Sequence, residues 1–238
     1  YHYPSPSTEE LLDRVARVRQ EAKLAGVEGP VWYSKADARH GYFQIEVHPD
    51  DRKFLGFTVP VLHGSYLYTV LPMGLSQSSA EFQKRMGVIL SPIANRTVFE
   101  YDVDGKVPAD SRGKPGVDGA ARADAAHTSP PRSVKRGTAI GTAMVYVDDL
   151  LCISVGSREE HEALVYKTFA LFAKHNIVFK LSKTALFRHE IEFLGHTLTQ
   201  TGVKQQLGKT SAIVNWPPIT SVAELRSFVG LASYYRKL

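Results

Sequence analysis

The chain has 238 residues, of which 43% are apolar and 22% are charged, so it is long enough to build a buried globular core. Its formal net charge of +5 suits a nucleic-acid partner, although many proteins share such a balance. Its one cysteine, Cys152, excludes an internal disulfide, and no apolar run approaches the roughly 20 residues needed to span a bilayer.

Four segments open with a Ser that is followed three residues later by a Glu, the pattern of a capping box. In this motif the Ser hydroxyl accepts a hydrogen bond from an amide of the first helical turn, and the Glu carboxylate accepts one from the Ser amide. Apolar residues recur at helical spacing after each start, which predicts amphipathic helices. The four starts are Ser7/Glu10, Ser78/Glu81, Ser157/Glu160 and Ser221/Glu224.

Runs of β-branched and aromatic residues between these helices predict strands. Met144–Val147 and Leu150–Ser154 are expected to form a hairpin with Asp148 and Asp149 at its turn. The order of elements predicts an α+β fold, an antiparallel sheet with helices on one face, of the split βαβ kind. The other expected strands are Val31–Asp37, Tyr42–Val47, Ser65–Leu71, Val178–Leu181 and Ile191–Leu198.

Residues 93–140 lack periodicity and are rich in Gly, Pro, Asp, Arg and Ala. A structureless stretch of this length is unusual inside a compact domain, so these residues are predicted to be a disordered low-complexity insertion. Its origin stays open between a tolerated surface loop and read-through of non-coding sequence.

Asp148 and Asp149 are neighbouring carboxylates between two strongly apolar runs. A plain turn is one interpretation, because Asp is a common turn residue. The apolar flanks favour a second one, since adjacent charges at the end of a buried hairpin repel each other unless a cation lies beside them. Asp37, at the end of an expected strand, is either a turn residue or a third carboxylate. Three such oxygen donors suit a pair of Mg²⁺ or Mn²⁺ ions, which can hold both oxygens of an in-line displacement.

Further segments lie around these carboxylates in a fixed order, and together they resemble the reverse transcriptases of gypsy-type long-terminal-repeat retrotransposons. A YxDD tetrapeptide alone is weakly specific, whereas six blocks in the right order are highly specific. The blocks are Asp37 with Tyr42 and Gln44-Ile45, Leu71-Pro-Met-Gly-Leu-Ser-Gln-Ser-Ser-Ala-Glu-Phe-Gln83, Tyr146-Val-Asp-Asp149, Leu181-Ser-Lys183, Phe193-Leu-Gly-His196, and Asn215-Trp-Pro-Pro218 with the segment 224–236.

The resemblance implies a polymerase palm with partial fingers and the start of the thumb and connection. The implied parts are an N-terminal lead-in helix at 1–30, palm and fingers with the first two blocks at 31–92, and the insertion at 93–140. A second palm segment with the metal-binding hairpin and primer grip would follow at 141–199, and the thumb or connection would begin at 200–238.

The resemblance also implies an RNA-directed DNA polymerase that adds deoxynucleotides to a primer 3′-hydroxyl. Asp37 and Asp148 would ligate two Mg²⁺ or Mn²⁺ ions, and Asp149 would assist. The other implied site residues are Tyr42 beneath the incoming sugar, His40 and Gly41 near the triphosphate, Met73 and Gly74 beside nucleotide and template, Lys183 as a proton donor to pyrophosphate, and Leu194, Gly195 and His196 at the primer end.

Each secondary role has a structural alternative: Tyr42 as a strand aromatic, Met73 as core filling, Lys183 as a solvated lysine and Gly195 as a turn residue. The sequence also departs from the family pattern. Ser79 stands where a Pro is usual, and the strand pair of the fingers that normally precedes Tyr3 is absent from this sequence. Two further functions therefore stay open, a catalytically inactive retroelement remnant that binds nucleic acid and a metal-dependent nuclease.

The expected partners are an RNA or DNA template with its primer and deoxynucleoside triphosphates, with no membrane. The resemblance places ribonuclease H, integrase and protease in other segments of a polyprotein, outside this chain. It also implies an intracellular location, in cytoplasmic particles and then the nucleus.

Overall fold

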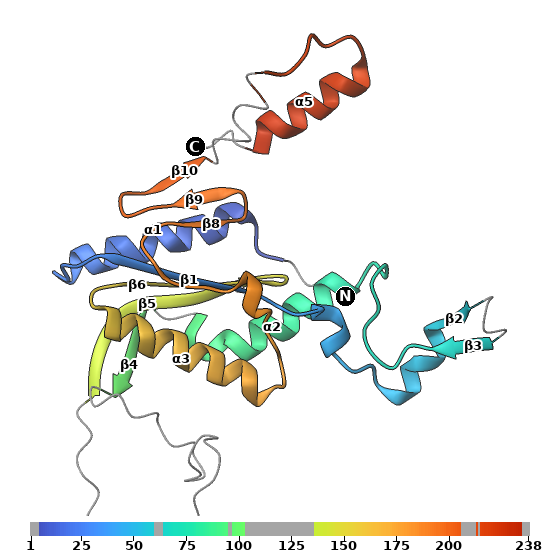
Figure 1. Ribbon diagram of the computed structural model, residues 1–238, viewed down its shortest axis with the longest axis horizontal. Helices are drawn as coiled ribbons and strands as arrows, with labels where there is room; N and C mark the ends of the chain where they lie inside the picture. Colours follow the sequence, from blue (N-terminus) through green and yellow to red (C-terminus); the bar gives the residue numbers. More distant parts are fainter. Residues whose placement is uncertain are drawn as a thin grey trace, which may run out of the picture.

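The computed structural model describes residues 5–59, 64–94, 97–102, 136–205, 213 and 215–234. At its centre is a five-stranded antiparallel sheet in the order β4-β5-β6-β1-β7 (Figure 1). These strands are β1 (Val31–Asp37), β4 (Val98–Asp102), β5 (Arg136–Tyr146), β6 (Asp149–Val155) and β7 (Ala185–Arg188).

Helices α2 (Ser78–Ala94) and α3 (Arg158–Lys174) cover one face of this sheet, and α1 (Thr8–Leu24) covers the other (Figure 1). Strand β6 serves both cores, because successive side chains of a strand point to opposite faces. Leu150 and Cys152 pack in the core of α2 and α3, while Leu151 and Ile153 pack in the core of α1. The predicted α+β palm is confirmed, and α1 adds a helix on the face that the sequence analysis left uncovered.

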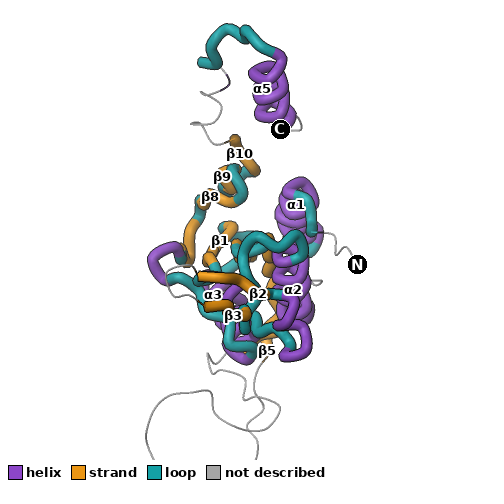
Figure 2. The backbone as a smooth tube through the Cα atoms, turned by 90° about the vertical axis from the view of Figure 1, so that its right-hand side faces the viewer, coloured by secondary structure: helices purple, strands orange, loops and turns teal. Residues whose placement is uncertain are grey.

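Two smaller units flank the sheet. The hairpin of β2 (Gly56–Val59) and β3 (Gly64–Leu67) follows the short 3₁₀ helices η1 (Gly41–Gln44) and η2 (Pro49–Phe54). A three-stranded sheet of β8 (Ile191–Phe193), β9 (His196–Leu198) and β10 (Val203–Gln205) lies beyond β1 (Figure 2), and its apolar side chains join the core of α1. The remaining elements are η4 (Leu181–Lys183) and α5 (Val222–Tyr234).

The predicted capping boxes form fully at α1 and α3. The Glu10 amide donates to Ser7 Oγ at 3.1 Å and the Ser7 amide to Glu10 Oε2 at 2.8 Å, and Ser157 and Glu160 exchange the same two bonds. The prediction was wrong at α2, where Ser78 already lies in the helix and its hydroxyl donates to a backbone carbonyl at 2.6 Å. At α5, the Glu224 amide donates to Ser221 Oγ, but the Glu224 carboxylate accepts from Thr220.

Four predicted strands are wrong in whole or in part. Ile191–Leu198, expected as one strand, is divided by a turn at Leu194 and Gly195 into the two strands β8 and β9. Tyr42–Val47 begins as the 3₁₀ helix η1, because the chain turns at His40, whose φ is 51° and ψ is 49°. Val178–Leu181 contributes only the single bridge between Phe179 and Ala38 before η4 begins. The expected strand from Ser65 to Leu71 ends at Leu67 as β3.

The predicted insertion at 93–140 is wrong at both ends. Helix α2 continues to Ala94, and residues 98–102 form β4, which pairs with the first half of β5. Residues 95–96 and 103–135 of this segment lie outside the described residues, as does the start of the chain through residue 4. The rest of the division into palm, fingers and thumb stays a prediction. No helix in the described part of the chain is long and apolar enough to cross a membrane.

Candidate active site

Three carboxylates meet at one end of the central sheet. The antiparallel register of β1 and β6 places Asp37 directly opposite Asp149. The tight turn between β5 and β6 consists of Val147, whose φ is 50°, and Asp148; Asp149, which was predicted to lie in this turn, instead begins β6 and pairs with Tyr146. The Ala38 amide donates to the Asp148 carbonyl at 2.9 Å, so this turn is bonded to the end of β1. The trio that the sequence analysis predicted is therefore brought together.

Gly41 makes room for the Asp148 carboxylate. A Cβ at this position would lie 2.2 Å from Asp148 Oδ1 and 2.8 Å from Phe82 Cζ. Asp148 Oδ1 is itself buried and has no hydrogen-bond partner within the described residues. A buried oxygen acceptor without a partner is costly, so this atom marks a place where a cation or donor fits.

Mutual repulsion and burial leave the site with surplus negative charge. The pKa of Asp148 is raised above its ordinary value by burial, and then by the charges of Asp37 and Asp149. The pKa of Asp149 is raised by burial and by Asp37, while the Lys35 and Lys183 ammonium groups act in the opposite direction. Both shifts mean that the carboxylate form lacks enough positive charge around it.

Lys183 forms an ion pair with one of these carboxylates. Lys183, in η4, places its Nζ 3.0 Å from Asp37 Oδ2, and this hydrogen bond raises the pKa of the lysine. Its side chain is more than half exposed, so the pair lies at the rim of the site. Lys183 therefore faces the carboxylates that the sequence analysis assigned to catalysis, and is more than an isolated surface lysine.

The donor set fits hard divalent cations. Carboxylate oxygens are the ligands that Mg²⁺ and Mn²⁺ prefer, and a cation beside the unpartnered Asp148 oxygen would offset the burial and repulsion that raise the pKa of this carboxyl. As they stand in the described part of the chain, no three His, Cys, Asp or Glu side chains form a ready-made metal cluster. Asp37 is instead engaged by Lys183.

A buried glutamine, to which the sequence analysis gave no role, fixes the hairpin that carries Asp148. Gln83 of α2 donates from Nε2 to the Val145 carbonyl at 3.2 Å, and its Oε1 accepts from the Val147 amide. It therefore binds the backbone on both sides of Tyr146. The sequence held a signal for this residue, because Gln83 occupies a position three and seven residues before Met86 and Leu90 on the apolar stripe of α2.

The residues expected near the nucleotide differ in their exposure to solvent. Tyr42 lies in η1, partly buried, with its ring edge-on to Phe82 at a centroid distance of 5.4 Å. His40 is exposed in a left-handed conformation. Met73 is 60% exposed, so it is not core filling, and the adjacent Gly74 has a φ of 94° with open space around it.

The expected primer grip forms the turn of the β8–β9 hairpin. Leu194 and Gly195 have φ values of 47° and 76°, and His196 is buried with its Nδ1 2.9 Å from the Leu194 carbonyl. Lys35 of β1 donates to the Glu192 carbonyl at 2.8 Å, which links this hairpin to the strand that ends in Asp37. The geometry agrees with a turn and leaves contact with a primer as a prediction.

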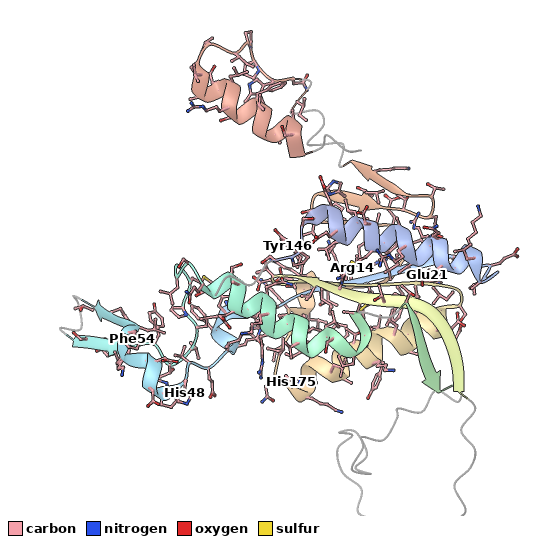
Figure 3. All side chains as sticks on the ribbon, turned by 180° about the vertical axis from the view of Figure 1, so that it is seen from behind. Arg14, Glu21, His48, Phe54, Tyr146 and His175 are labelled. Atoms are coloured by element: carbon pink, nitrogen blue, oxygen red, sulfur yellow. The ribbon has the colours of Figure 1, made fainter. Side chains whose placement is uncertain are left out.

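The site occupies the end of the sheet from which the β2–β3 unit extends. Tyr146 marks this end of β5, and His48 and Phe54 lie beyond it toward the hairpin (Figure 3). An antiparallel sheet with helices packed on it, with three carboxylates on a strand end and the adjacent hairpin turn, defines the palm of a nucleic-acid polymerase.

The chain belongs to the reverse transcriptase family. Residues 1–198 match the family model described as reverse transcriptase (RNA-dependent DNA polymerase). The chain is 26% identical over 235 residues to the retrovirus-related Pol polyprotein from transposon 297 of Drosophila melanogaster, with 99% of this chain and 16% of that protein covered. It is 24% identical to the Pol polyprotein from transposon gypsy of the same fly, with 98% and 17% covered. The predicted resemblance to gypsy-type elements is thereby confirmed.

Solved structures agree on the fold. The foamy viral protease-reverse transcriptase bound to double-stranded DNA superimposes with a TM-score of 0.62 in its dRH form, at 23% identity over 86% of this chain and 27% of that one. The same viral protein bound to an RNA/DNA hybrid gives a TM-score of 0.59 at 22% identity, over 86% and 21% of the two chains. The chain thus spans less than a third of these relatives. Members of this family generally use divalent metal ions.

Proposed function

We propose that this chain is the catalytic core of an RNA-directed DNA polymerase, which extends a primer 3′-hydroxyl with deoxynucleoside triphosphates on an RNA or DNA template. The observation that carries the proposal is the register of β1 and β6, which sets Asp37 opposite Asp149 and beside Asp148. The membership of the chain in the reverse transcriptase family supports the same conclusion.

In the proposed reaction, the primer 3′-hydroxyl loses its proton to solvent and its oxygen attacks the α-phosphorus of the nucleotide, while the bond from this phosphorus to the pyrophosphate oxygen breaks and pyrophosphate leaves. Asp37 and Asp148 would hold two Mg²⁺ or Mn²⁺ ions with help from Asp149. Such ions, when bound, lower the pKa of the attacking hydroxyl and stabilise the charge on the leaving group. The acidic trio thus supplies the oxygen ligands, and Gly41 keeps the space that the Asp148 carboxylate needs.

Other residues of the chain would bind and orient the substrates. Tyr42 lies two residues from Gln44 on η1, where its partly buried ring would lie beneath the incoming sugar. Lys183 already carries its proton beside Asp37, so it is placed to donate it to the departing pyrophosphate. The turn at Leu194 and Gly195 would hold the primer end. The foamy viral neighbours, captured with double-stranded DNA and with an RNA/DNA hybrid, support such a partner.

Primer extension on an RNA template with Mg²⁺ tests the proposal, and compares the parent chain with Asp148→Asn. The variant keeps the size of the side chain and removes its charge, so we expect extension by the parent alone and none after chelation of the metal. Extension by the variant would refute the assignment of Asp148. Shortening of the labelled primer would instead indicate a nuclease.

Absence of extension by both proteins would favour the inactive remnant. Such a remnant would bind primer–template with an affinity that falls steeply as salt rises, because lysine and arginine contacts to phosphates release counterions. Filter binding across a salt series separates that outcome from a protein without any nucleic-acid affinity.

A further inference from the structure

Gln44 bridges two segments that each carry a residue of the proposed site. Its Nε2 donates to the Arg39 carbonyl at 2.6 Å and to the Val178 carbonyl at 3.0 Å, while its Oε1 accepts from the Val178 amide at 2.6 Å. The side chain thus fills both hydrogen-bonding positions of Val178, as a neighbouring strand would do.

We propose that Gln44 is a positioning residue, which fixes the segment 178–183 against the turn after Asp37 and thereby holds Lys183 beside the catalytic carboxylates. The placement of Lys183 is a structural inference, whereas its catalytic meaning rests on the function proposed above. Because Gln44 and Tyr42 share the helix η1, the same residue also links the nucleotide-sugar side of the site to its lysine.

Besides Gln44, the segment that carries Lys183 is held by backbone bonds, by one aromatic side chain and by strand β7 just after it, in which Ala185 pairs with Lys35 of β1. Its backbone is joined to the turn after β1 by a bond from the Arg39 amide to the Val178 carbonyl at 2.9 Å and by one from the Lys180 amide to the Asp37 carbonyl at 2.8 Å. Phe179 provides an apolar anchor on α3, with ring centroids 5.2 and 5.1 Å from two phenylalanines. The Val178 and Leu181 side chains are 54% and 86% exposed, so they add little packing.

The ion pair of Lys183 cannot by itself hold this segment. Exposed lysine–carboxylate pairs contribute little, because two hydrated side chains must be ordered for one weak interaction. Lys183 meets Asp37 because its backbone is fixed on both sides, through η4, where the Lys183 amide donates to the Lys180 carbonyl at 3.0 Å, and through Ala185, which pairs with Lys35 of β1. Loss of the Gln44 bonds should therefore make residues 178–183 more mobile, including the Lys183 side chain.

Two local measurements test this inference in the full chain without any need for polymerase activity. We expect Gln44→Ala to speed hydrogen exchange of the Val178 amide about tenfold, the effect of losing one hydrogen bond of ordinary strength. We also expect acetylation of Lys183 by acetic anhydride, followed by mass spectrometry, to rise roughly two- to fivefold, the range for loss of an exposed ion pair.

Two controls and a second variant make the result specific. Gln20→Ala removes an exposed glutamine from α1 and should change neither readout. Lys84, which is 52% exposed and paired with Glu81 on α2, serves as an internal reference for acetylation. Gln44→Glu keeps the size of the side chain but turns a carboxylate toward two carbonyls, so it should release Lys183 even where Gln44→Ala folds poorly.

Unchanged exchange at Val178 and unchanged acetylation of Lys183 in either folded variant would overturn the inference. So would a rise at Lys84 in step with Lys183, because this would show general loosening of the fold. A parent chain that protects Lys183 through Gln44 but never extends a primer would refute the proposed function and leave the positioning role intact.

Discussion

Gly41 is a residue whose small size serves the site directly. Its φ is not in the left-handed region, so the constraint comes from contact with Asp148 and Phe82 alone. We expect Gly41→Ala to push the Asp148 carboxylate from its place, to abolish metal-dependent extension and to lower the free energy of unfolding by about 1–3 kcal/mol, as overpacking does. Primer extension and urea unfolding would measure the two effects.

Gly202→Ala is the matched control for this change. Gly202 lies in the turn between β9 and β10 with nothing within 4 Å of the position that its Cβ would take. The control should retain both extension and stability. Wild-type extension by Gly41→Ala would show that Asp148 can be repositioned without loss.

A buried histidine behind the site makes stability depend on pH. His161 of α3 lies within 2.8 Å of both Ser34 Oγ on β1 and Ser154 Oγ on β6, so it joins the helix to two strands. Burial lowers its pKa from 6.5 to about 4. Between these values the unfolded chain binds a proton that the folded chain does not, so stability is complete above pH 6.5 and is lost as the pH falls toward 4.

We expect His161→Gln to flatten this dependence, because a glutamine can bond the two serines but does not titrate. The difference between the pKa values corresponds to a loss of up to about 3 kcal/mol for the parent between pH 6.5 and 4. Urea unfolding of both proteins across this range would measure it. Equal slopes in parent and variant would assign the pH dependence to other groups.

At the scale of elements, helix α2 and the β5–β6 hairpin are joined through one side chain. Gln83→Ala would leave the Val147 amide and the Val145 carbonyl without their partner, at a cost of about 1–3 kcal/mol. Because these groups flank Tyr146 and precede Asp148, we expect extension to fall more steeply than stability. Gln77→Ala, an exposed glutamine just before α2, is the control and should match the parent. Full activity in folded Gln83→Ala would show that the hairpin is held by its own strands.

Helices and strands were predicted well where interactions between residues close in sequence decide the structure. The capping boxes at Ser7 and Ser157 formed as predicted, because each needs only a Ser and a Glu within the same helical turn. Ser78 failed as a cap because a carbonyl outside the helix, that of Pro72, takes its hydroxyl. The aromatic run after Gly41 reads as a strand by propensity, but the turn at His40 and packing on Phe82 give a 3₁₀ helix instead.

Pairing at the edges of the sheet was harder to predict than its centre. Strand β7 was not predicted. It lies at the edge of the sheet, and its four residues alternate between half-buried and exposed positions, so it lacks the fully buried residues that mark a strand clearly. Strand β4 was hidden in the segment expected to be disordered, and it pairs with β5 over residues far along the chain. By contrast β6, which is buried along nearly its whole length, was predicted almost to the residue.

At the scale of the whole molecule, the order of the family-like blocks predicted the site better than the spacing of its residues along the chain. Asp37 and Asp149 are remote in sequence, and only the register of β1 with β6 sets them opposite each other. The resemblance predicted this meeting. It could not predict that Gln44 and Gln83 would hold the surrounding backbone, since their partners are carbonyl and amide groups that every residue possesses.

Residues 103–135, which lie outside the described residues, connect two paired strands. The last pair of the β4–β5 ladder is Asp102 and Arg136, so the two residues that flank this segment are direct neighbours across the ladder. An Asn-Gly turn suits such antiparallel neighbours, because its backbone twist matches that of the strands. A shorter connection also loses less entropy when the hairpin closes.

We therefore expect replacement of residues 103–135 by Asn-Gly to keep the fold and to raise the free energy of unfolding by about 1–2 kcal/mol, through the shorter closing loop. Extension and primer–template affinity should match those of the parent, since Asp37, Asp148 and Asp149 lie at the opposite end of β5 and β6 from this junction. A Gly-Ser linker as long as the natural segment is the control and should match the parent in stability. Loss of primer–template affinity in both replacements, with the fold retained, would show that residues 103–135 themselves contact nucleic acid.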